Sequence, residues 1–307
     1  MVQSSSNLVV VGGGIMGGDI AFLFAAAGWN VDVVSPSQKT RDALPKRIDA
    51  AMTVRGLQAE VMGRVTARAE LGQVDWQQVD LVVEAVSEDL ALKQQIFVQI
   101  EALAGPDVPL ASNTSNFQIS EVGKLLKHRQ RLVGMHFFMP AHLVPLVEVI
   151  SSDATDPAIA QSICNALKAM GKEPIWVKKD IPGFVGNRIQ HAMMREALYL
   201  IDKGVVSPED VDIAVRFGFG FRFIACGPIM QKEMSGWDTN CRVGNALYPH
   251  LHNDAGVPPG LQRMVDEGRT GMKSLAGMWP WTEQSAAQEK AQIERRLRAA
   301  LEMLRAN

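Results

Sequence analysis

The chain has 307 residues, of which 47% are hydrophobic, so it is long enough to bury the cores of two domains. Its formal net charge of -2 leaves no basic face for nucleic acid and no polybasic segment for a membrane, which favours a small-molecule partner. No apolar run approaches the ~20 residues that span a bilayer, the first seven residues do not resemble a secretory signal, and three scattered cysteines suggest neither disulfides nor a metal site. A cytoplasmic protein is expected.

In the first part of the chain, short β-branched runs alternate with helical stretches, which is typical of a parallel sheet covered on both faces. Seven runs bounded by polar or turn residues are predicted strands: residues 8–11, 31–34, 80–86, 109–112, 132–137, 146–150 and 174–177. Helices are predicted between them, for example over residues 89–103 and 157–170, the second after the capping residues Thr155 and Asp156.

After Asp180 the predicted secondary structure changes from alternating strands and helices to helices. Ile181, Pro182 and Gly183 form a breaker, and helical periodicity dominates beyond it. Five helices are predicted there: residues 184–203, 207–217, 228–251, 259–267 and 283–304. The predicted fold is therefore α/β, with a mostly parallel sheet domain over residues 1–180 and a smaller all-α domain over residues 181–307.

The first predicted strand is followed by Gly12-Gly-Gly14-Ile15-Met16-Gly17 and then by a long apolar helix. This is the spacing G-x-G-x-x-G, in which the first glycine permits a tight turn, the second lets a pyrophosphate approach the backbone, and the third lets helix and strand pack closely. Between a strand and a helix, the motif predicts a Rossmann-type dinucleotide site with phosphate at the helix N-terminus. The alternative is a glycine turn that binds no ligand.

Sites of this kind that bind NAD usually place an acidic residue at the end of the second strand, on the ribose 2′-hydroxyl. Ser35 occupies that place, whereas Asp32 lies within the strand, where its side chain points elsewhere. With Lys39 and Arg41 in the following segment, a 2′-phosphate could be accommodated. NAD is the expected cofactor, and NADP is the alternative.

Further along the chain, six segments carry polar residues in a recognisable order: Asp80-Leu-Val-Val-Glu84-Ala-Val with Glu88 and Lys93, Ser112-Asn113-Thr-Ser115, His136-Phe-Phe-Met139-Pro, Leu146-Val-Glu148-Val, Pro182-Gly-Phe-Val-Gly-Asn187-Arg and Ser207-Pro-Glu-Asp-Val-Asp212. With the glycine motif, these segments resemble the L-3-hydroxyacyl-CoA dehydrogenase family, from the glycine turn to about residue 280. The resemblance implies a Rossmann domain followed by a helical domain that dimerises, and hence a homodimer.

The resemblance also implies roles for individual residues. His136 would be the general base that takes the proton from the substrate hydroxyl while hydride passes to the nicotinamide, and Glu148 would orient His136 and favour its imidazolium. Ser115 and Asn187 would form hydrogen bonds with the substrate oxygen and with groups next to the histidine ring. Three more residues would lie along the cofactor: Glu84, Lys93 and Asn113.

The residues themselves support the pair His136 and Glu148. Histidine titrates near neutral pH, so it can accept a proton and return it, and a carboxylate on one ring nitrogen sets the tautomer. The two residues lie on successive predicted strands, so a hairpin-like approach would join them, and a buried acid needs such a partner. The alternative is a purely structural pair. The other histidines are expected to be surface or packing residues: His128, His142, His191, His250 and His252.

Three departures from the family concern the ligands. Ser35 replaces the usual acid, Met139 replaces the usual asparagine after His136-Phe-Phe, and the run Gly218-Phe-Gly-Phe-Arg222-Phe replaces Gly-Leu-Gly-Tyr-Pro. An arginine here resembles the L-gulonate and carnitine dehydrogenases, which oxidise free hydroxy acids, and a guanidinium can bind a carboxylate through two parallel bonds. Residues 38–71 also contain only two lysines for the phosphates of CoA.

The expected function is therefore that of an NAD(P)-dependent dehydrogenase acting on a small alcohol or aldehyde that bears a carboxylate. The substrate could be a heteroaromatic acid such as the pyridine carboxylates of vitamin B6 catabolism, because Met139, Phe219, Phe221 and Trp237 could provide an aromatic and apolar lining. The alternative is an L-3-hydroxyacyl-CoA dehydrogenase. A more remote alternative is a non-catalytic NAD-binding structural or sensor protein, against which the four polar residues of the expected site argue.

Overall fold

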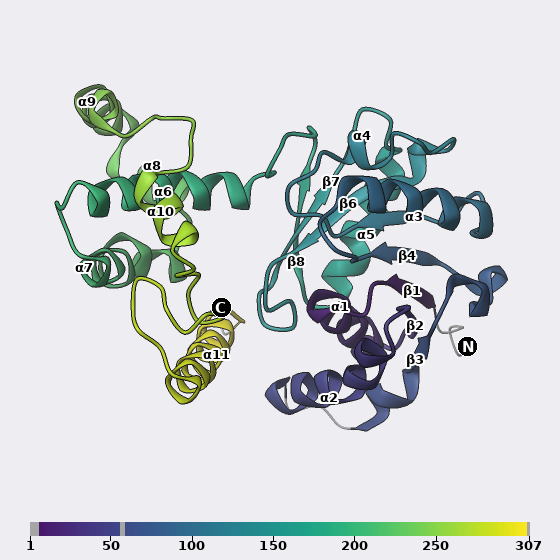
Figure 1. Ribbon diagram of the computed structural model, residues 1–307. Helices are drawn as coiled ribbons and strands as arrows, with labels where there is room; N and C mark the ends of the chain where they lie inside the picture. Colours follow the sequence, from purple (N-terminus) through teal and green to yellow (C-terminus); the bar gives the residue numbers. More distant parts are fainter. Residues whose placement is uncertain (1–5, 56–58, 306–307) are drawn as a thin grey trace. The chain divides into compact units, whose positions relative to one another are not determined.

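The computed structural model describes residues 6–55 and 59–305, and the chain separates into two compact units, residues 1–187 and 188–307 (Figure 1). The domain boundary predicted after residue 180 falls in the link between the last strand, β8 (Glu173–Val177), and the helix α6 (Gly186–Asp202). That helix begins in the first unit and continues into the second.

The first unit contains one eight-stranded sheet in the order β3-β2-β1-β4-β5-β6-β7-β8. Its other strands are β1 (Asn7–Val11), β2 (Asn30–Val34), β3 (Val65–Arg68), β4 (Leu81–Glu84), β5 (Leu110–Ser112), β6 (Leu132–Phe137) and β7 (Leu146–Ile150). The pairs from β3 to β6 are parallel, β7 runs antiparallel to β6, and β8 is parallel to β7. The predicted mostly parallel sheet is confirmed, with one strand more than predicted.

Helices cover both faces of this sheet (Figure 1). On β1, Leu8 and Val10 belong to a core shared with α1 (Ile15–Ala26), α2 (Gln38–Arg55) and α5 (Pro157–Ala169). Val9 and Val11 belong to a second core shared with α3 (Leu90–Leu103) and α4 (Ile119–Val122). Because successive side chains of a strand point to opposite faces, a continuous run of valines can serve both cores.

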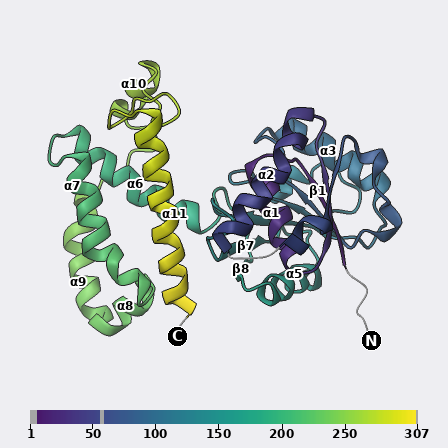
Figure 2. The same ribbon diagram turned by 90° about the horizontal axis from the view of Figure 1, so that it is seen from below.

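The second unit is helical, and Figure 2 shows α11 as its longest straight element. After α6 come α7 (Pro208–Ile213), α8 (Pro228–Ser235), α9 (Trp237–Leu247), α10 (Pro259–Asp266) and α11 (Glu283–Arg305). The single helix predicted over residues 228–251 is wrong, because Gly236 lies between α8 and α9 with a φ of 86°, which ends the helix.

The described residues contain no single helix that is long and apolar enough to cross a membrane. One bent pair of helical segments, Pro208–Ile224 with Pro228–Ser235, meets that criterion by length and composition.

Candidate active site

The glycine turn joins β1 to α1, and its three motif glycines differ in what surrounds them. Gly12 has a φ of 112°, and a Cβ there would lie 2.4 Å from the carbonyl oxygen of Ala85. A Cβ at Gly17 would lie 1.7 Å from the carbonyl oxygen of Gly12, whereas a Cβ at Gly14 would meet no described atom within 4 Å. Gly12 and Gly17 are thus required for packing, and Gly14 faces open space.

The N-terminus of α1 is suited to an anion. Among the described residues no side chain caps it, and its first turn, which begins at Ile15, holds no acidic residue. Its backbone N–H groups therefore remain available for phosphate, which the helix dipole also favours. Together with the open space at Gly14, this geometry fits the pyrophosphate of a dinucleotide.

Ser35 follows the last residue of β2, as predicted, and its side chain is buried. Its carbonyl oxygen accepts a hydrogen bond of 2.6 Å from the guanidinium of Arg41. Asp32, earlier on β2, forms an ion pair of 2.9 Å with Arg68 on β3. The group at the end of β2 is thus a neutral serine beside an arginine.

His136 on β6 and Glu148 on β7 lie directly opposite each other in the antiparallel register. The distance from His136 Nδ1 to Glu148 Oε2 is 2.7 Å, and the residues are 4% and 0% exposed. The other carboxylate oxygen, Oε1, accepts hydrogen bonds of 2.9 Å from the N–H groups of Val185 and Gly186. The pair that was predicted from successive strands is present, and Glu148 is fully hydrogen-bonded.

The environment of Glu148 keeps it ionised at neutral pH. Burial raises the pKa of Glu148, but the hydrogen bonds from His136, Gly186 and Val185 outweigh burial, so the pKa lies below its ordinary value of 4.5. An ionised carboxylate only accepts hydrogen bonds. The proton between the two residues therefore belongs to His136 Nδ1, which leaves Nε2 as the ring nitrogen that can exchange a proton with a substrate.

Two phenylalanines flank the histidine ring. The ring centres of Phe138 and Phe184 lie 4.6 and 5.7 Å from that of His136. Phe184 is fully buried with a φ of 51°, and a Cβ at Gly186 would lie 2.5 Å from the Phe138 ring. The sequence did not indicate a role for these rings, although both belong to segments that resemble the family.

The loop that follows β5 carries Ser115. Glu88 holds this loop, because its Oε1 accepts hydrogen bonds from the Thr114 hydroxyl (2.6 Å) and from the N–H groups of Ser115 (3.0 Å) and Asn116 (3.1 Å). The side-chain amide of Asn187 donates to the carbonyl oxygen of Ser115 at 3.1 Å. Because Asn187 directly follows Gly186, which donates to Glu148, all four predicted catalytic residues are linked within one network.

The side chains of Glu84 and Lys93 are buried and bind each other at 2.8 Å. Glu84 also accepts a hydrogen bond of 2.6 Å from Ser112, and Lys93 lies 3.2 Å from Glu88. These charges therefore connect the ends of β4 and β5 to the Ser115 loop, and their part in cofactor binding stays a prediction. Asn113, also predicted along the cofactor, accepts a hydrogen bond of 3.0 Å from the N–H of Phe137.

Besides Ser115, two residues are predicted to bind substrate, Met139 and Arg222, and both are exposed. Met139 is 64% exposed at the start of the loop between β6 and β7. Arg222 belongs to the 3₁₀ turn Gly220–Ile224 of the helical unit, where the rings of Phe219 and Phe223 pack at 5.9 Å. Their contact with a substrate stays a prediction.

His142 is a buried packing residue, but it also has a carboxylate partner that the sequence did not indicate. Its Nδ1 lies 3.0 Å from Asp19 Oδ2, and both residues are nine-tenths buried. The sequence offered no sign of this pair, because Asp19 lies more than a hundred positions earlier on an apolar helix.

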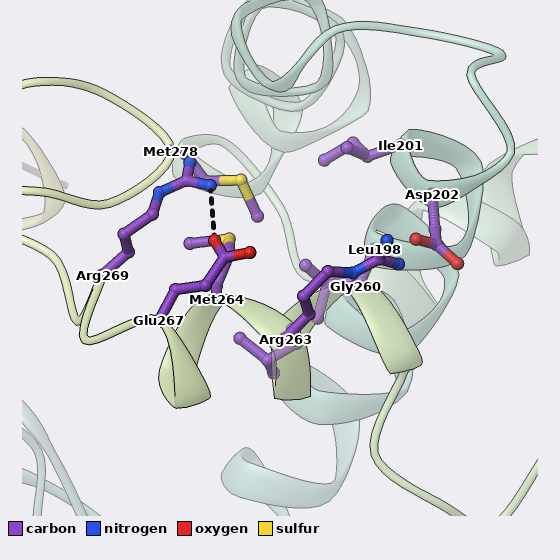
Figure 3. Close-up of a pocket in the computed structure, with 10 residues that line it drawn as sticks. Leu198, Ile201, Asp202, Gly260, Arg263, Met264, Glu267, Arg269 and Met278 are labelled. Atoms are coloured by element: carbon purple, nitrogen blue, oxygen red, sulfur yellow. Dashed lines mark hydrogen bonds and ion pairs between the residues drawn. The ribbon is translucent and has the colours of Figure 1, made fainter.

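The helical unit has a cavity of about 410 Å³, which Figure 3 shows between residues of α6 and α10. An ion pair of 3.3 Å joins Arg269 to Glu267 at its side. None of the predicted site residues lines this cavity. The candidate active site is therefore defined by the network around His136 and not by the cavity.

Comparison with protein families gives two matches in sequence. The NAD-binding domain of 3-hydroxyacyl-CoA dehydrogenase matches residues 7–181, and the C-terminal domain of the same enzyme matches residues 183–281. Together these matches cover most of the chain, including the glycine turn and the His136 network.

Individual proteins similar to this chain are dehydrogenases as well. The 5-formyl-3-hydroxy-2-methylpyridine 4-carboxylate 5-dehydrogenase of Mesorhizobium japonicum is 31% identical over 306 residues, covering 97% of this chain and 98% of that protein. The 3-hydroxybutyryl-CoA dehydrogenase of Mycobacterium tuberculosis is 33% identical over 296 residues, covering 92% of this chain and 100% of that protein.

Solved structures include both kinds of relative. A 5-formyl-3-hydroxy-2-methylpyridine 4-carboxylic acid 5-dehydrogenase, described as an NAD⁺-dependent dismutase, superposes with a TM-score of 0.93 at 30% identity, covering 98% of this chain and 99% of that one. The (S)-3-hydroxybutyryl-CoA dehydrogenase of Ralstonia eutropha superposes with a TM-score of 0.73 at 31% identity, covering 91% of this chain and 100% of that one. The fold, the glycine turn and these matches lead to one conclusion: the chain belongs to the 3-hydroxyacyl-CoA dehydrogenase family and is an NAD-dependent dehydrogenase that acts on CH–OH groups.

Proposed function

We propose that this dehydrogenase uses His136 as its general base on a small alcohol or aldehyde that bears a carboxylate, in particular a pyridine carboxylate. The observation that carries the catalytic part is the 2.7 Å bond between His136 Nδ1 and a fully buried, ionised Glu148. A histidine held in this way by a carboxylate is the usual arrangement for reversible proton transfer.

The proposed mechanism assigns one task to each residue. NAD would be held at the glycine turn and the N-terminus of α1, and it would supply the acceptor for the hydride on the carbon that carries the substrate hydroxyl. His136 removes the hydroxyl proton at Nε2, and Glu148 stabilises the resulting imidazolium across the 2.7 Å bond. The Ser115 hydroxyl hydrogen-bonds the substrate oxygen, and Asn187 holds the Ser115 backbone in place at 3.1 Å. In the reverse direction His136 returns the proton to the carbonyl oxygen. An aldehyde is oxidised as its hydrate: water adds to the carbonyl carbon, His136 removes a hydroxyl proton of the hydrate, and loss of the hydride gives the acid.

The choice of substrate rests on similarity over the whole chain and on one residue. The pyridine carboxylate dehydrogenase structure matches this chain with a TM-score of 0.93, against 0.73 for the hydroxybutyryl-CoA enzyme at nearly equal identity. Arg222 stands where the family usually has proline, and a guanidinium has a partner in a carboxylate but none in a thioester. Met139 supplies an apolar side chain after His136-Phe-Phe, in place of an amide.

The second candidate is a 3-hydroxyacyl-CoA dehydrogenase. It is favoured by the family matches over residues 7–181 and 183–281 and by the 33% identity to the M. tuberculosis enzyme. Both candidates share the chemistry of His136 and differ only in what the rest of the site binds. An NAD sensor without turnover is the remote third possibility.

We further propose a homodimer in the cytoplasm. The family resemblance supports the dimer, as do large apolar side chains exposed on the helical unit, including Phe217, Met234 and Tyr248. The three cysteines are free in the structure, which suits a reducing compartment.

The test is a turnover panel with NAD and, separately, NADP, in which the aldehydes, gulonate and carnitine receive the oxidised cofactor and acetoacetyl-CoA, which can only be reduced, receives NADH or NADPH. The substrates are a pyridine carboxaldehyde bearing a carboxylate, the same aldehyde without the carboxylate, gulonate, carnitine and acetoacetyl-CoA. We expect the highest kcat/KM for the carboxylated pyridine with NAD. Acetoacetyl-CoA turnover far above that of every free acid would refute the proposed substrate class. NADH binding without any turnover would favour the NAD sensor. With the aldehyde, equal amounts of acid and alcohol without net NADH formation would indicate dismutation, as described for the relative.

A further inference from the structure

A further group of buried charged side chains lies apart from both the catalytic pair and the Glu84–Lys93 pair. Asp19 on α1, His142 in the loop between β6 and β7, and Lys172 just before β8 are 8%, 9% and 4% exposed. The proposed mechanism uses none of them. Burying three ionisable groups in one region is costly unless they are hydrogen-bonded, so their contacts indicate what they hold in place.

Two of these side chains, Asp19 and Lys172, bind the backbone of one loop, and the third, His142, belongs to that loop and contacts Asp19. Asp19 Oδ2 accepts hydrogen bonds from the N–H of Ala141 (2.9 Å) and lies 3.0 Å from His142 Nδ1. The ammonium of Lys172 donates to the carbonyl oxygens of Ala141 (2.5 Å) and Val144 (2.8 Å). Ala141 is therefore held through its N–H by α1 and through its carbonyl oxygen by Lys172.

The loop so held is the connection between the two catalytic strands. It begins directly after Phe137 and ends before Leu146, so it joins the strand of His136 to the strand of Glu148. Its first residues are Phe138, whose ring packs 4.6 Å from the His136 ring, and the exposed Met139. A displacement of this loop would move both side chains relative to His136.

The helix that supplies Asp19 is the one that begins at the glycine turn. Asp19 lies four residues after Ile15, the first residue of α1. The same helix therefore presents its N-terminus to the cofactor and its Asp19 carboxylate to the loop. The His142 ring also packs edge-on against Phe22 of α1, at 6.5 Å.

We propose that Asp19, His142 and Lys172 form a positioning cluster that fixes the loop of residues 138–145 on the cofactor helix α1 and thereby places Phe138 and Met139 at the reaction site. For stability alone, apolar residues of similar volume would serve at least as well. What the three charges provide is one defined backbone position, and displacements of about 1 Å near reacting groups cost up to ~100-fold in rate. This inference rests on the proposed role of His136.

The experiment compares His142→Ala with His142→Asn, because an asparagine amide can donate a hydrogen bond close to the position of Nδ1. Three quantities are measured for each variant: amide hydrogen exchange of residues 138–145, NADH affinity by fluorescence, and kcat with the best substrate of the panel. For His142→Ala we expect faster exchange confined to this loop, NADH affinity within about twofold of the native protein, and kcat lowered about tenfold. His142→Asn should restore most of the protection from exchange and most of kcat.

The matched control is His128→Ala, which removes an exposed histidine of the same unit and should change none of the three quantities. If His142→Ala lowers only the melting temperature, or if exchange rises throughout the unit, the cluster is merely structural and the inference is wrong. If His142→Ala does not fold, Asp19→Asn, which keeps the side-chain volume, replaces it with the same expected results. Because exchange is measured without turnover, the cluster can be judged even if the panel contains no substrate, and a fully active His136→Ala variant would refute the proposed function alone.

Discussion

Glu148 has a different task for each of its two oxygens. Oε2 holds His136, and Oε1 accepts the N–H groups of Val185 and Gly186 at the start of α6. A carboxylate at a helix N-terminus is favourable because it pairs with N–H groups that have no partner within the helix. One buried acid therefore sets the tautomer of His136 and also holds the start of α6, where Asn187 lies.

The first prediction tests His136 and Glu148 by kinetics. His136→Ala removes the base and should lower kcat by at least ~100-fold, because general base catalysis typically contributes that much. Glu148→Gln keeps the shape but supplies an amide, so it should also lower kcat strongly while leaving NADH affinity within about twofold. Steady-state kinetics and NADH fluorescence measure both. The assignment of the base would be refuted by a His136→Ala variant with near-native kcat.

The second prediction concerns stability against pH. Because the pKa of Glu148 lies below its ordinary value of 4.5 in the folded protein, the ionised form stabilises the fold above that pH, and this stabilisation is lost as the pH falls through the folded pKa. The melting temperature of Glu148→Gln should therefore lie further below that of the native protein at pH 7 than at pH 4. Thermal unfolding at both pH values measures this, and an equal difference at both would contradict it.

The third prediction tests Arg222. Arg222→Ala should raise KM for carboxylate substrates about 10-fold or more, since a hydrogen bond to a charged group contributes roughly 1.5–3 kcal/mol, and should change KM much less for uncharged alcohols. Arg216→Ala, an exposed arginine of the preceding π-helical turn, is the matched control. Equal losses for charged and uncharged substrates would exclude a carboxylate contact.

At the scale of elements, the glycine turn between β1 and α1 must allow close packing and must also leave space for a ligand. The motif G-x-G-x-x-G does not show which glycine serves which requirement. Gly17 must be glycine because α1 packs against the backbone of Gly12, whereas Gly14 faces open space at the helix N-terminus. The first requirement belongs to the fold, and the second belongs to the ligand.

The fourth prediction follows from this difference. Gly17→Ala would place its Cβ 1.7 Å from a backbone oxygen, so we expect a large loss of stability or no folded protein. Gly14→Ala should fold with a melting temperature close to that of the native protein but bind NADH at least ~10-fold more weakly, because its methyl group occupies the approach of the pyrophosphate. Thermal unfolding and fluorescence titration measure both. Native NADH affinity in Gly14→Ala would show that the cofactor does not approach this turn.

At the scale of the whole molecule, the proposed dimer gives a fifth prediction. Light scattering after size-exclusion chromatography should give twice the mass of one chain, because the exposed apolar side chains of the helical unit are costly to leave in water. A mass of one chain at micromolar concentration would contradict the dimer.

The elements that were predicted correctly have strong local signals. The strands around His136 and Glu148 were placed at their observed bounds, and Asp156 caps α5 as expected, with its side chain accepting from Ala158 at 2.8 Å. The edge strand β3 was missed, because Val65–Arg68 is short and only partly buried. The break at Gly236 was missed because one glycine inside a helical pattern does not by itself end a helix.

The sequence by itself determined the sheet, the glycine turn and the pairing of His136 with Glu148, because short β-branched runs, a glycine turn and two successive strands are local patterns with a family resemblance to support them. Only the tertiary structure decided which buried charges meet across long separations. Glu88 reaches the Ser115 loop, Val185 and Gly186 donate to Glu148, and Asp19 finds His142 through 123 positions of chain. A buried charge must have a partner, but its energy depends on the distance in space and not in sequence, so no local pattern could name that partner.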